Sequence, residues 1–293
     1  MNLNLQGPGL TLSQAETLGN LVEAQHTQEL GPGVARLVRV HATDATRQLV
    51  AERSAAAGFD FAFVPAGYRL ADFRVLAMDM DSTLINIECI DEIADAVGVK
   101  PQVAAITEAA MRGEISDFAD SLRRRVALLD GVPASALQTV YTERLRLNPG
   151  AEALIEAAHA AGVTTLLVSG GFTFFTQRLQ TRLALGAAHA NELDIIDGRL
   201  TGRVLGTILD AEGKAAHLRR LCASLGADSR HQAIAIGDGA NDLRMMAEAA
   251  VSVAYRAKPA VRAAATYALN VAGLDGVLNW FEDTAGPEHA LKR

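Results

Sequence analysis

Three short apolar runs in this 293-residue chain each end directly in a polar or glycine-rich cluster. The runs lie at 74–78, 163–168 and 233–236, and the clusters begin at Asp79, Ser169 and Gly237. Apolar runs of this length that alternate with helical patterns predict the buried strands of a parallel sheet. Because open α/β sheets bind ligands beyond the carboxyl ends of their strands, the clusters are expected to meet in one crevice. The chain is therefore predicted to be an α/β protein with a doubly wound parallel sheet.

Helical patterns at 149–160, from Phe172 and from Asp242 follow these strands and complete the predicted sheet-and-helix alternation. The core is therefore expected to take residues 71–86 and 148–293. Within it, Asp197-Gly198 separates two short alternating runs, which predicts a β-hairpin over 193–205.

Residues 87–147 interrupt this core and carry only helical periodicity, for example at Ile90, Ile93 and Val97. An all-helical insert placed directly after the first strand suits a mobile cap. Closure of such a cap would exclude water from the crevice.

Residues 1–70 carry no phosphate, metal or nucleophile signature. A strand-like run at 34–40, a helical stretch at 45–57 and a second strand-like run at 59–64 predict a small N-terminal α/β unit. A stabilising extension of the core fits this unit.

Asp79 and Asp81 form a carboxylate pair in the pattern Asp-x-Asp-x-Thr. A carboxylate can attack a phosphate ester and form an aspartyl-phosphate, and Asp79 is the candidate nucleophile. Strand geometry turns Asp81 to the same side, where it can protonate the leaving group and later deprotonate water. The competing interpretation, a helix cap and a turn, would not explain the other clusters.

The candidate metal residues are Asp79, Asp81 and Asp238. A set of oxygen donors without a Cys or His cluster favours Mg²⁺. Because like charge raises the pKa of one of two close carboxylates, and a bound cation favours ionisation of the one it touches, the roles should separate. Asp79 is expected to be anionic on the metal, and Asp81 protonated and off it.

The candidate phosphate ligands are Ser169, Gly170, Gly171 and Lys214. The Ser169 hydroxyl can donate to a phosphate oxygen, and the two glycines let backbone N–H groups approach it. Lys214 would supply a fixed positive charge for the phosphate and the transition state. The alternatives are a tight strand-to-helix turn for the glycines and a solvated surface position for the lysine.

These motifs together resemble the haloacid dehalogenase superfamily, and residues 75–281 are similar to its phosphoserine phosphatases. The resemblance implies a phosphoric monoester hydrolase that acts on O-phosphoserine in serine biosynthesis. It also implies that Asn241 contacts phosphate and that Asp242 supports the site. The resemblance permits a regulatory or dimerising module at residues 1–70 as the alternative to a stabilising extension, so a homodimer is one expectation.

The resemblance extends to residues that would recognise the amino-acid part of the substrate. It implies that Glu88 contacts the substrate ammonium and that Arg125 grips its carboxylate, for which a guanidinium fork is well shaped. Met111 and Phe118 resemble the apolar cover of the pocket. Structural alternatives are a helix cap for Glu88 and a solvated helix face for Arg125.

Two other functions fit the same motifs. One is hydrolysis of another small phosphomonoester, such as phosphothreonine or phosphohomoserine. The other is a non-catalytic sensor that binds phosphoserine, although a pure binding protein has no use for an acid/base such as Asp81.

Composition is consistent with a small-molecule enzyme. The net charge of −7 and pI of about 5.5, without a basic stripe, argue against nucleic acid and anionic membrane as partners. The N-terminus lacks the basic and apolar regions of a secretory signal, so a cytoplasmic location is expected. Because the cytoplasm is a reducing compartment, the two cysteines of the chain, Cys89 and Cys222, are expected to be free thiols.

Overall fold

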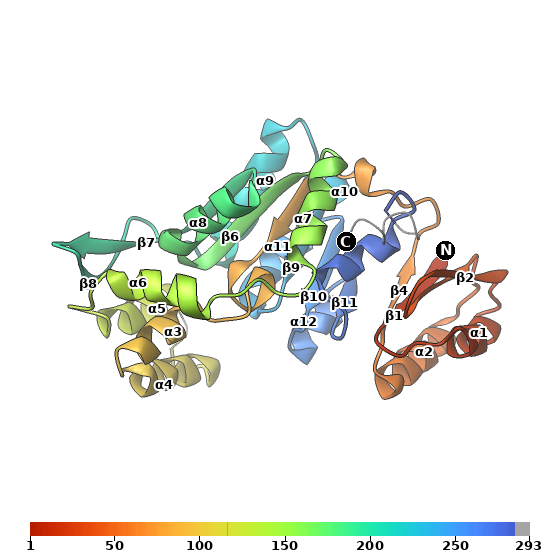
Figure 1. Ribbon diagram of the computed structural model, residues 1–293, viewed down its shortest axis with the longest axis horizontal. Coiled ribbons are helices and arrows are strands. Elements are labelled where there is room, and N and C mark those ends of the chain that lie inside the picture. Colours follow the sequence, from red (N-terminus) through yellow and green to blue (C-terminus); the bar gives the residue numbers. More distant parts are fainter. Residues whose placement is uncertain (116, 285–293) are drawn as a thin grey trace.

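The computed structural model describes residues 1–115 and 117–284, apart from the side chain of Met111. A seven-stranded sheet forms the centre of the molecule, a four-stranded sheet lies at its N-terminal end, and a group of helices lies at the other end (Figure 1). Among the helices of the described residues, none is long and apolar enough to cross a membrane.

The central sheet has the strand order β11-β10-β9-β5-β6-β7-β8. All neighbouring strands are parallel except β7 and β8, which confirms the doubly wound parallel sheet predicted from the sequence. The strands are β5 (Val75–Met78), β6 (Thr164–Phe172), β7 (Ala187–Ile196), β8 (Arg199–Leu205), β9 (Ala233–Gly237), β10 (Val251–Tyr255) and β11 (Tyr267–Leu269).

The helices of the core cover both faces of this sheet. Alternate residues of β5 pack on opposite faces: Leu76 and Met78 join one buried cluster with α7 (Ala151–Ala160) and α8 (Thr173–Leu183). Val75 and Ala77 join a second cluster with α9 (Ala211–Ser224), α11 (Leu243–Ala247) and α12 (Pro259–Ala264). Strands buried on both faces explain why the sequence shows continuous apolar runs. The short helix α10 (Ser229–Gln232) precedes β9.

The predicted hairpin is confirmed. β7 and β8 are antiparallel, with Ile196 opposite Arg199, so Asp197 and Gly198 form a two-residue loop. Both loop residues have positive φ, 50° for Asp197 and 73° for Gly198, as a primed hairpin turn requires.

The insert between β5 and α7 is helical, as its periodicity predicts. It contains α3 (Cys89–Ala96), α4 (Lys100–Met111), α5 (Phe118–Ala127), α6 (Ser135–Thr139) and a further turn at Val140–Arg144. These helices lie together at one end of the molecule, below β7 and β8 in Figure 1. The predicted limits of the insert, residues 87 and 147, stay a prediction, as do the other predicted domain limits.

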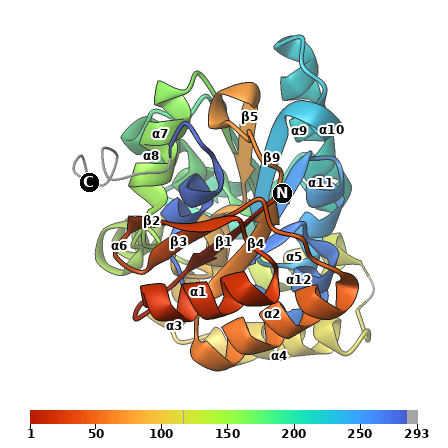
Figure 2. The same ribbon diagram turned by 90° about the vertical axis from the view of Figure 1, so that its right-hand side faces the viewer.

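The N-terminal unit is a four-stranded antiparallel sheet with two helices on one face (Figure 2). Leu3 and Leu5 pack against the helices, while Asn4 and Gln6 face the core and contact Asn279. The strand order is β2-β3-β1-β4, and the elements are β1 (Asn2–Gln6), α1 (Leu12–Leu21), β2 (His26–Gly31), β3 (Val34–Val38), α2 (Asp44–Ala57) and β4 (Asp60–Val64).

Candidate active site

Asp79 follows β5 directly and lies against the face of the sheet that α9 covers. Alternation along the strand places residue 79 on the same side as Val75 and Ala77, and this side packs against α9. Lys214 is in the first turns of α9, and its Nζ lies 2.7 Å from Asp79 Oδ1. Two residues 135 positions apart are therefore brought together by strand order and side-chain alternation.

Lys214 is fully buried and joins two carboxylates. Its Nζ lies 2.7 Å from Oδ1 of Asp79 and 2.7 Å from Oδ1 of Asp242, and its side chain is 1% exposed. Burial alone would lower the pKa of Lys214, but the carboxylates of Asp242 and Asp79 together raise it above its ordinary value. The ammonium is thus permanently charged at neutral pH, and the solvated-surface alternative does not describe its position.

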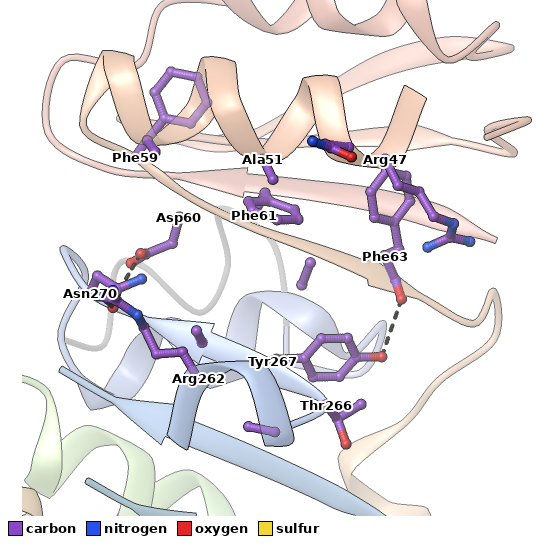
Figure 3. A pocket seen from close by; sticks show the side chains of 15 residues that line it. Arg47, Ala51, Phe59, Asp60, Phe61, Phe63, Arg262, Thr266, Tyr267 and Asn270 are labelled. Atoms are coloured by element: carbon purple, nitrogen blue, oxygen red, sulfur yellow. Dashed lines mark hydrogen bonds between the residues drawn. The ribbon is translucent and has the colours of Figure 1, made fainter. Parts of the chain in front are cut away.

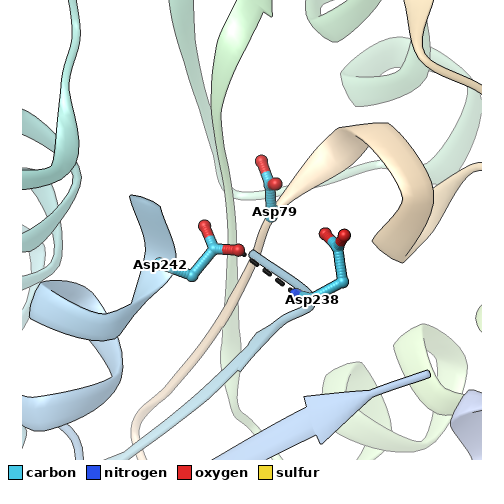
Figure 4. Close-up of side chains that lie close together, drawn as sticks. All are labelled: Asp79, Asp238 and Asp242. Atoms are coloured by element: carbon cyan, nitrogen blue, oxygen red, sulfur yellow. Dashed lines mark hydrogen bonds between the residues drawn. The ribbon is translucent and has the colours of Figure 1, made fainter. Parts of the chain in front are cut away.

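Three carboxylates converge at the ends of β5 and β9. Asp79, Asp238 and Asp242 each offer one oxygen, and these oxygens lie within 4.8 Å of one another (Figure 4). Asp242 Oδ2 accepts from the backbone N–H groups of Asp238 and Gly239, and its Oδ1 accepts from Lys214. Asp238 Oδ1 accepts from the hydroxyl of Thr83 at 3.0 Å. Asp242 therefore has protein donors on both of its oxygens, whereas Asp79 and Asp238 keep more acceptor capacity.

This donor set fits a divalent cation that prefers oxygen. Burial raises the pKa of Asp79 well above its ordinary value, with Asp242 adding to the effect, and burial with Asp242 raises the pKa of Asp238 to about 6. One ammonium does not compensate three close carboxylates, so a cation would relieve their repulsion. Asp81 lies outside this group of three, and the structure gathers Asp242 with Asp79 and Asp238 instead.

Asp81 is half-buried beside the first turn of α3. Its Oδ1 accepts from the backbone N–H of Cys89 at 3.2 Å. Burial, with the Glu88 carboxylate adding to it, raises the pKa of Asp81 to about 7. A carboxyl with such a pKa can both give and take a proton near neutral pH.

The Ser169-Gly170-Gly171 cluster, which the sequence places after the second strand, forms the end of β6. Ser169 is 1% exposed, and its Oγ accepts from the N–H of Gly171 at 2.9 Å. A Cβ on Gly170 would come within 2.9 Å of Phe118, and a Cβ on Gly171 within 2.7 Å of Asp81 Oδ2. A side chain at either position would force Phe118 or Asp81 to move, so the two glycines let the cap and the loop after β5 approach the backbone closely.

Two oppositely charged side chains of the cap lie near Asp81. Glu88 accepts from the hydroxyl of Ser82 at 2.7 Å, and burial raises its pKa. Arg125, from α5, is partly buried; burial lowers its pKa, and the carboxylates of Asp91, Glu88 and Asp81 oppose that shift. Arg125 is half-buried, its Nε lies 3.4 Å from the carbonyl oxygen of Ser121, and it is near enough to these carboxylates for their charge to act on it.

The remaining predicted residues lie around this group. Phe118 begins α5 and covers Gly170, as a pocket cover would. Asn241 folds back over Gly239, next to Asp242. The side chain of Met111, which ends α4, lies outside the described part of the chain.

Asn148 is a buried residue that the sequence-based prediction missed. Its Nδ2 donates to the backbone carbonyls of Thr83 at 2.8 Å and Ile85 at 3.0 Å, and lies 3.4 Å from that of Ser82. Ser82 has a φ of 57°, a conformation that costs energy for a residue with a side chain. Asn148 therefore helps to hold the strained loop that carries Asp79 and Asp81.

We expect Asn148→Ala to lower the free energy of unfolding by roughly 2–3 kcal/mol, because buried carbonyls lose their donor. The activity should also fall, since the loop is free to relax. Thermal unfolding and steady-state kinetics would measure both, with Asn20→Ala on the exposed side of α1 as the control. An unchanged melting temperature would show that water replaces the amide.

Asn191 is a second residue that the sequence-based prediction missed. It connects the end of β6 to the segment before α9. Its Nδ2 donates to the carbonyl of Gly170 at 2.8 Å, and its Oδ1 accepts from the N–H of Leu209 at 2.7 Å. Asn191 lies in β7, upstream of the hairpin predicted at 193–205, so no sequence signal marked it.

Comparisons with known proteins agree with this geometry. A family model described as haloacid dehalogenase-like hydrolase matches residues 76–247. A phosphoserine phosphatase of Polaromonas sp. is 58% identical over 214 residues, which is 72% of this chain and 90% of that protein.

Solved structures extend the similarity over nearly the whole chain. A HAD family hydrolase from Salmonella enterica serovar Typhi matches with a TM-score of 0.86 at 32% identity, covering 97% of this chain and 99% of that one. A probable phosphoserine phosphatase from Vibrio cholerae matches with a TM-score of 0.80 at 35% identity, covering 95% and 85%. The N-terminal sheet therefore has counterparts in similar proteins.

Proposed function

Because the chain belongs to the haloacid dehalogenase-like hydrolases, and to the phosphoserine phosphatases among them, we propose that it hydrolyses O-phosphoserine to serine and orthophosphate. The observation that carries the substrate assignment is the pair Glu88 and Arg125. The exposed carboxylate of Glu88 and the half-buried guanidinium of Arg125 lie close enough to Asp81 for the charges of the three groups to influence one another's pKa. Together they match an ammonium and a carboxylate on one substrate.

The chemistry of the site is that of an aspartyl-phosphate mechanism. Asp79 attacks phosphorus, while Asp81, with its raised pKa, gives a proton to the departing serine oxygen. The ionised Asp81 then takes a proton from the water that hydrolyses the aspartyl-phosphate. Lys214, Ser169 and the β6 backbone hold the phosphoryl oxygens, and Asn241 lies at the rim of the same site.

Mg²⁺ is the proposed cofactor, and Asp79 and Asp238 are the carboxylates that would hold it. Asp242 supports the site by accepting hydrogen bonds from Lys214 and from the backbone N–H of Asp238. A contribution of Asp81 to metal binding stays a prediction. When bound, the cation would supply the positive charge that lets a carboxylate approach a phosphate dianion.

The proposed reaction yields free serine, so serine biosynthesis is the proposed context. A small-molecule substrate agrees with the similarity to phosphoserine phosphatases. A homodimer and a cytoplasmic location stay predictions.

Orthophosphate release from a panel of phosphomonoesters tests this function. We expect turnover of phosphoserine to exceed that of phosphohomoserine and of sugar phosphates, and to be lost with a chelator and restored by Mg²⁺. Similar turnover of sugar phosphates would overturn the roles of Glu88 and Arg125 but keep the mechanism. Binding of phosphoserine without phosphate release would instead favour the sensor.

Replacing Arg125 isolates the recognition of the substrate carboxylate. We expect Arg125→Gln to raise the KM for phosphoserine roughly 100-fold, because loss of one member of a buried charge pair costs about 2–5 kcal/mol. The KM for phosphoethanolamine, which lacks the carboxylate, should not change. Arg123→Gln on the exposed side of α5 is the matched control. An equal rise for both substrates would mean that Arg125 only shapes the cap.

A further inference from the structure

A cavity of about 530 Å³ lies between the N-terminal unit and the edge of the central sheet (Figure 3). Its walls come from α2 and β4 on one side and from α12 and β11 on the other. β4 and β11 are edge strands of their sheets. None of the candidate active-site residues lines it, so it is separate from the site of hydrolysis.

Aromatic side chains form the apolar part of this cavity. Phe59, Phe61, Phe63 and Tyr267 line it, although aromatic residues make up only 5% of the chain. Phe61 and Phe63 are half-buried on β4, with ring centroids 6.2 Å apart and nearly perpendicular planes. Partly exposed rings gathered in one concave place are typical of a surface that binds a flat apolar group.

Two guanidinium groups provide the charge of the cavity. Arg47 of α2 lies over the ring of Phe63 at 4.3 Å, and Arg262 of α12 donates to Asn270 Oδ1 at 3.2 Å. Figure 3 shows these arginines on opposite sides of the aromatic group. Within the described residues, neither forms an ion pair with an acidic side chain, and the Met1 Sδ that accepts from Arg47 Nη2 at 2.7 Å carries no charge, so neither guanidinium is neutralised.

The one carboxylate in the cavity wall does not cancel this charge. Asp60 accepts from the backbone N–H groups of Asn270, Val271 and Ala272 at 2.8–3.0 Å. These bonds occupy both carboxylate oxygens and join β4 to the segment after β11. Two arginines against one carboxylate leave the cavity with a net positive charge, and its aromatic rings lie between the arginines.

We propose that this cavity binds a small aromatic molecule that carries anionic groups, carboxylate or phosphate. Its ring would lie against Phe61 and Phe63, and its anionic groups would accept from Arg47 and Arg262. A guanidinium presents paired donors that match both kinds of anion. Because the ligand would contact the N-terminal unit and the core together, its binding would stabilise their junction.

Titration calorimetry on the full chain tests this proposal with three matched probes. Naphthalene-2,6-dicarboxylate should bind saturably and raise the melting temperature. The neutral naphthalene-2,6-dimethanol and the non-aromatic cyclohexane-1,4-dicarboxylate should each bind at least about tenfold more weakly, since each lacks one feature. Adenosine monophosphate is titrated in parallel. Tighter binding of the nucleotide would identify phosphate as the anionic group, and tighter binding of the dicarboxylate would identify carboxylate.

Substitutions then locate the binding. Arg262→Gln and Arg47→Gln should each weaken the dicarboxylate about tenfold. Arg203→Gln, an exposed arginine on β8 at the opposite edge of the central sheet, should leave it unchanged. Absence of saturable binding by the dicarboxylate and by the nucleotide, or equal binding by Arg262→Gln, Arg47→Gln and the wild type, would overturn the proposal. None of these readouts depends on phosphatase activity.

Discussion

Asp79→Asn is expected to reduce kcat for phosphoserine by at least about 10⁴-fold, the scale of loss when a nucleophile is removed. An amide keeps the volume of the side chain but cannot attack phosphorus, and it is a poorer ligand for a cation. Release of orthophosphate and trapping of a phosphorylated enzyme would measure the effect. Retention of activity within tenfold would overturn the assignment of the nucleophile.

The same substitution should make the metal-free protein more stable. Asp79, Asp238 and Asp242 share one ammonium, and burial with the Asp242 charge holds the pKa of Asp79 well above its ordinary value. A carboxyl whose pKa is raised by folding stabilises the native state at low pH, and this contribution is lost as the pH rises through the folded value. The amide never ionises, so its advantage in melting temperature should grow with pH.

Melting curves in chelator at several pH values would measure this advantage, with Asp72→Asn, an exposed carboxylate, as the control. If Asp79→Asn melts below the wild type at every pH, the carboxylate makes a favourable contact that outweighs the repulsion. If Asp79→Asn is more stable but inactive, the carboxylate at position 79 lowers the stability of the metal-free protein and is kept because catalysis needs it.

The sequence was sufficient to predict the parts of the fold that follow from local patterns. Continuous apolar runs marked β5, β6 and β9, and the Asp197-Gly198 pair marked the hairpin, because these signals depend on neighbouring residues. The N-terminal unit was predicted only in part. Its strand β1 reads Asn-Leu-Asn-Leu-Gln, and its alternate polar residues face the core instead of solvent, which a sequence pattern does not reveal.

The site was predictable where a motif carries the chemistry and not where distant backbone groups meet. Strand ends identified Asp79, Ser169 and Asp238, since parallel strands bring their carboxyl ends together. Asn148 and Asn191 act on carbonyl groups of loops far away in the chain, so their partners appear only after folding. The cationic cavity was missed for the same reason, because α2 and α12 are more than 200 residues apart.

Lys214→Met is expected to give the second largest loss, with kcat reduced about 10³-fold or more. The buried ammonium is the only cation within 3 Å of Asp79 and Asp242 among the described residues, and a preorganised charge is worth several kcal/mol in the transition state. Breaking a buried pair by removing one partner also destabilises a fold by about 3–5 kcal/mol, because the remaining charge is not compensated. Arg203→Met, on an exposed arginine of β8, should change neither property.

A double substitution separates these two effects of Lys214. Lys214→Met with Asp242→Asn removes the ammonium and one carboxylate together, so the melting temperature should recover much of the loss seen in Lys214→Met. The activity should not recover, because the phosphoryl group still lacks its fixed positive charge. Since the residues are in contact, the two changes should be far from additive in stability. Recovery of turnover in the double variant would mean that Lys214 serves only to neutralise Asp242, and that phosphate is held by other groups.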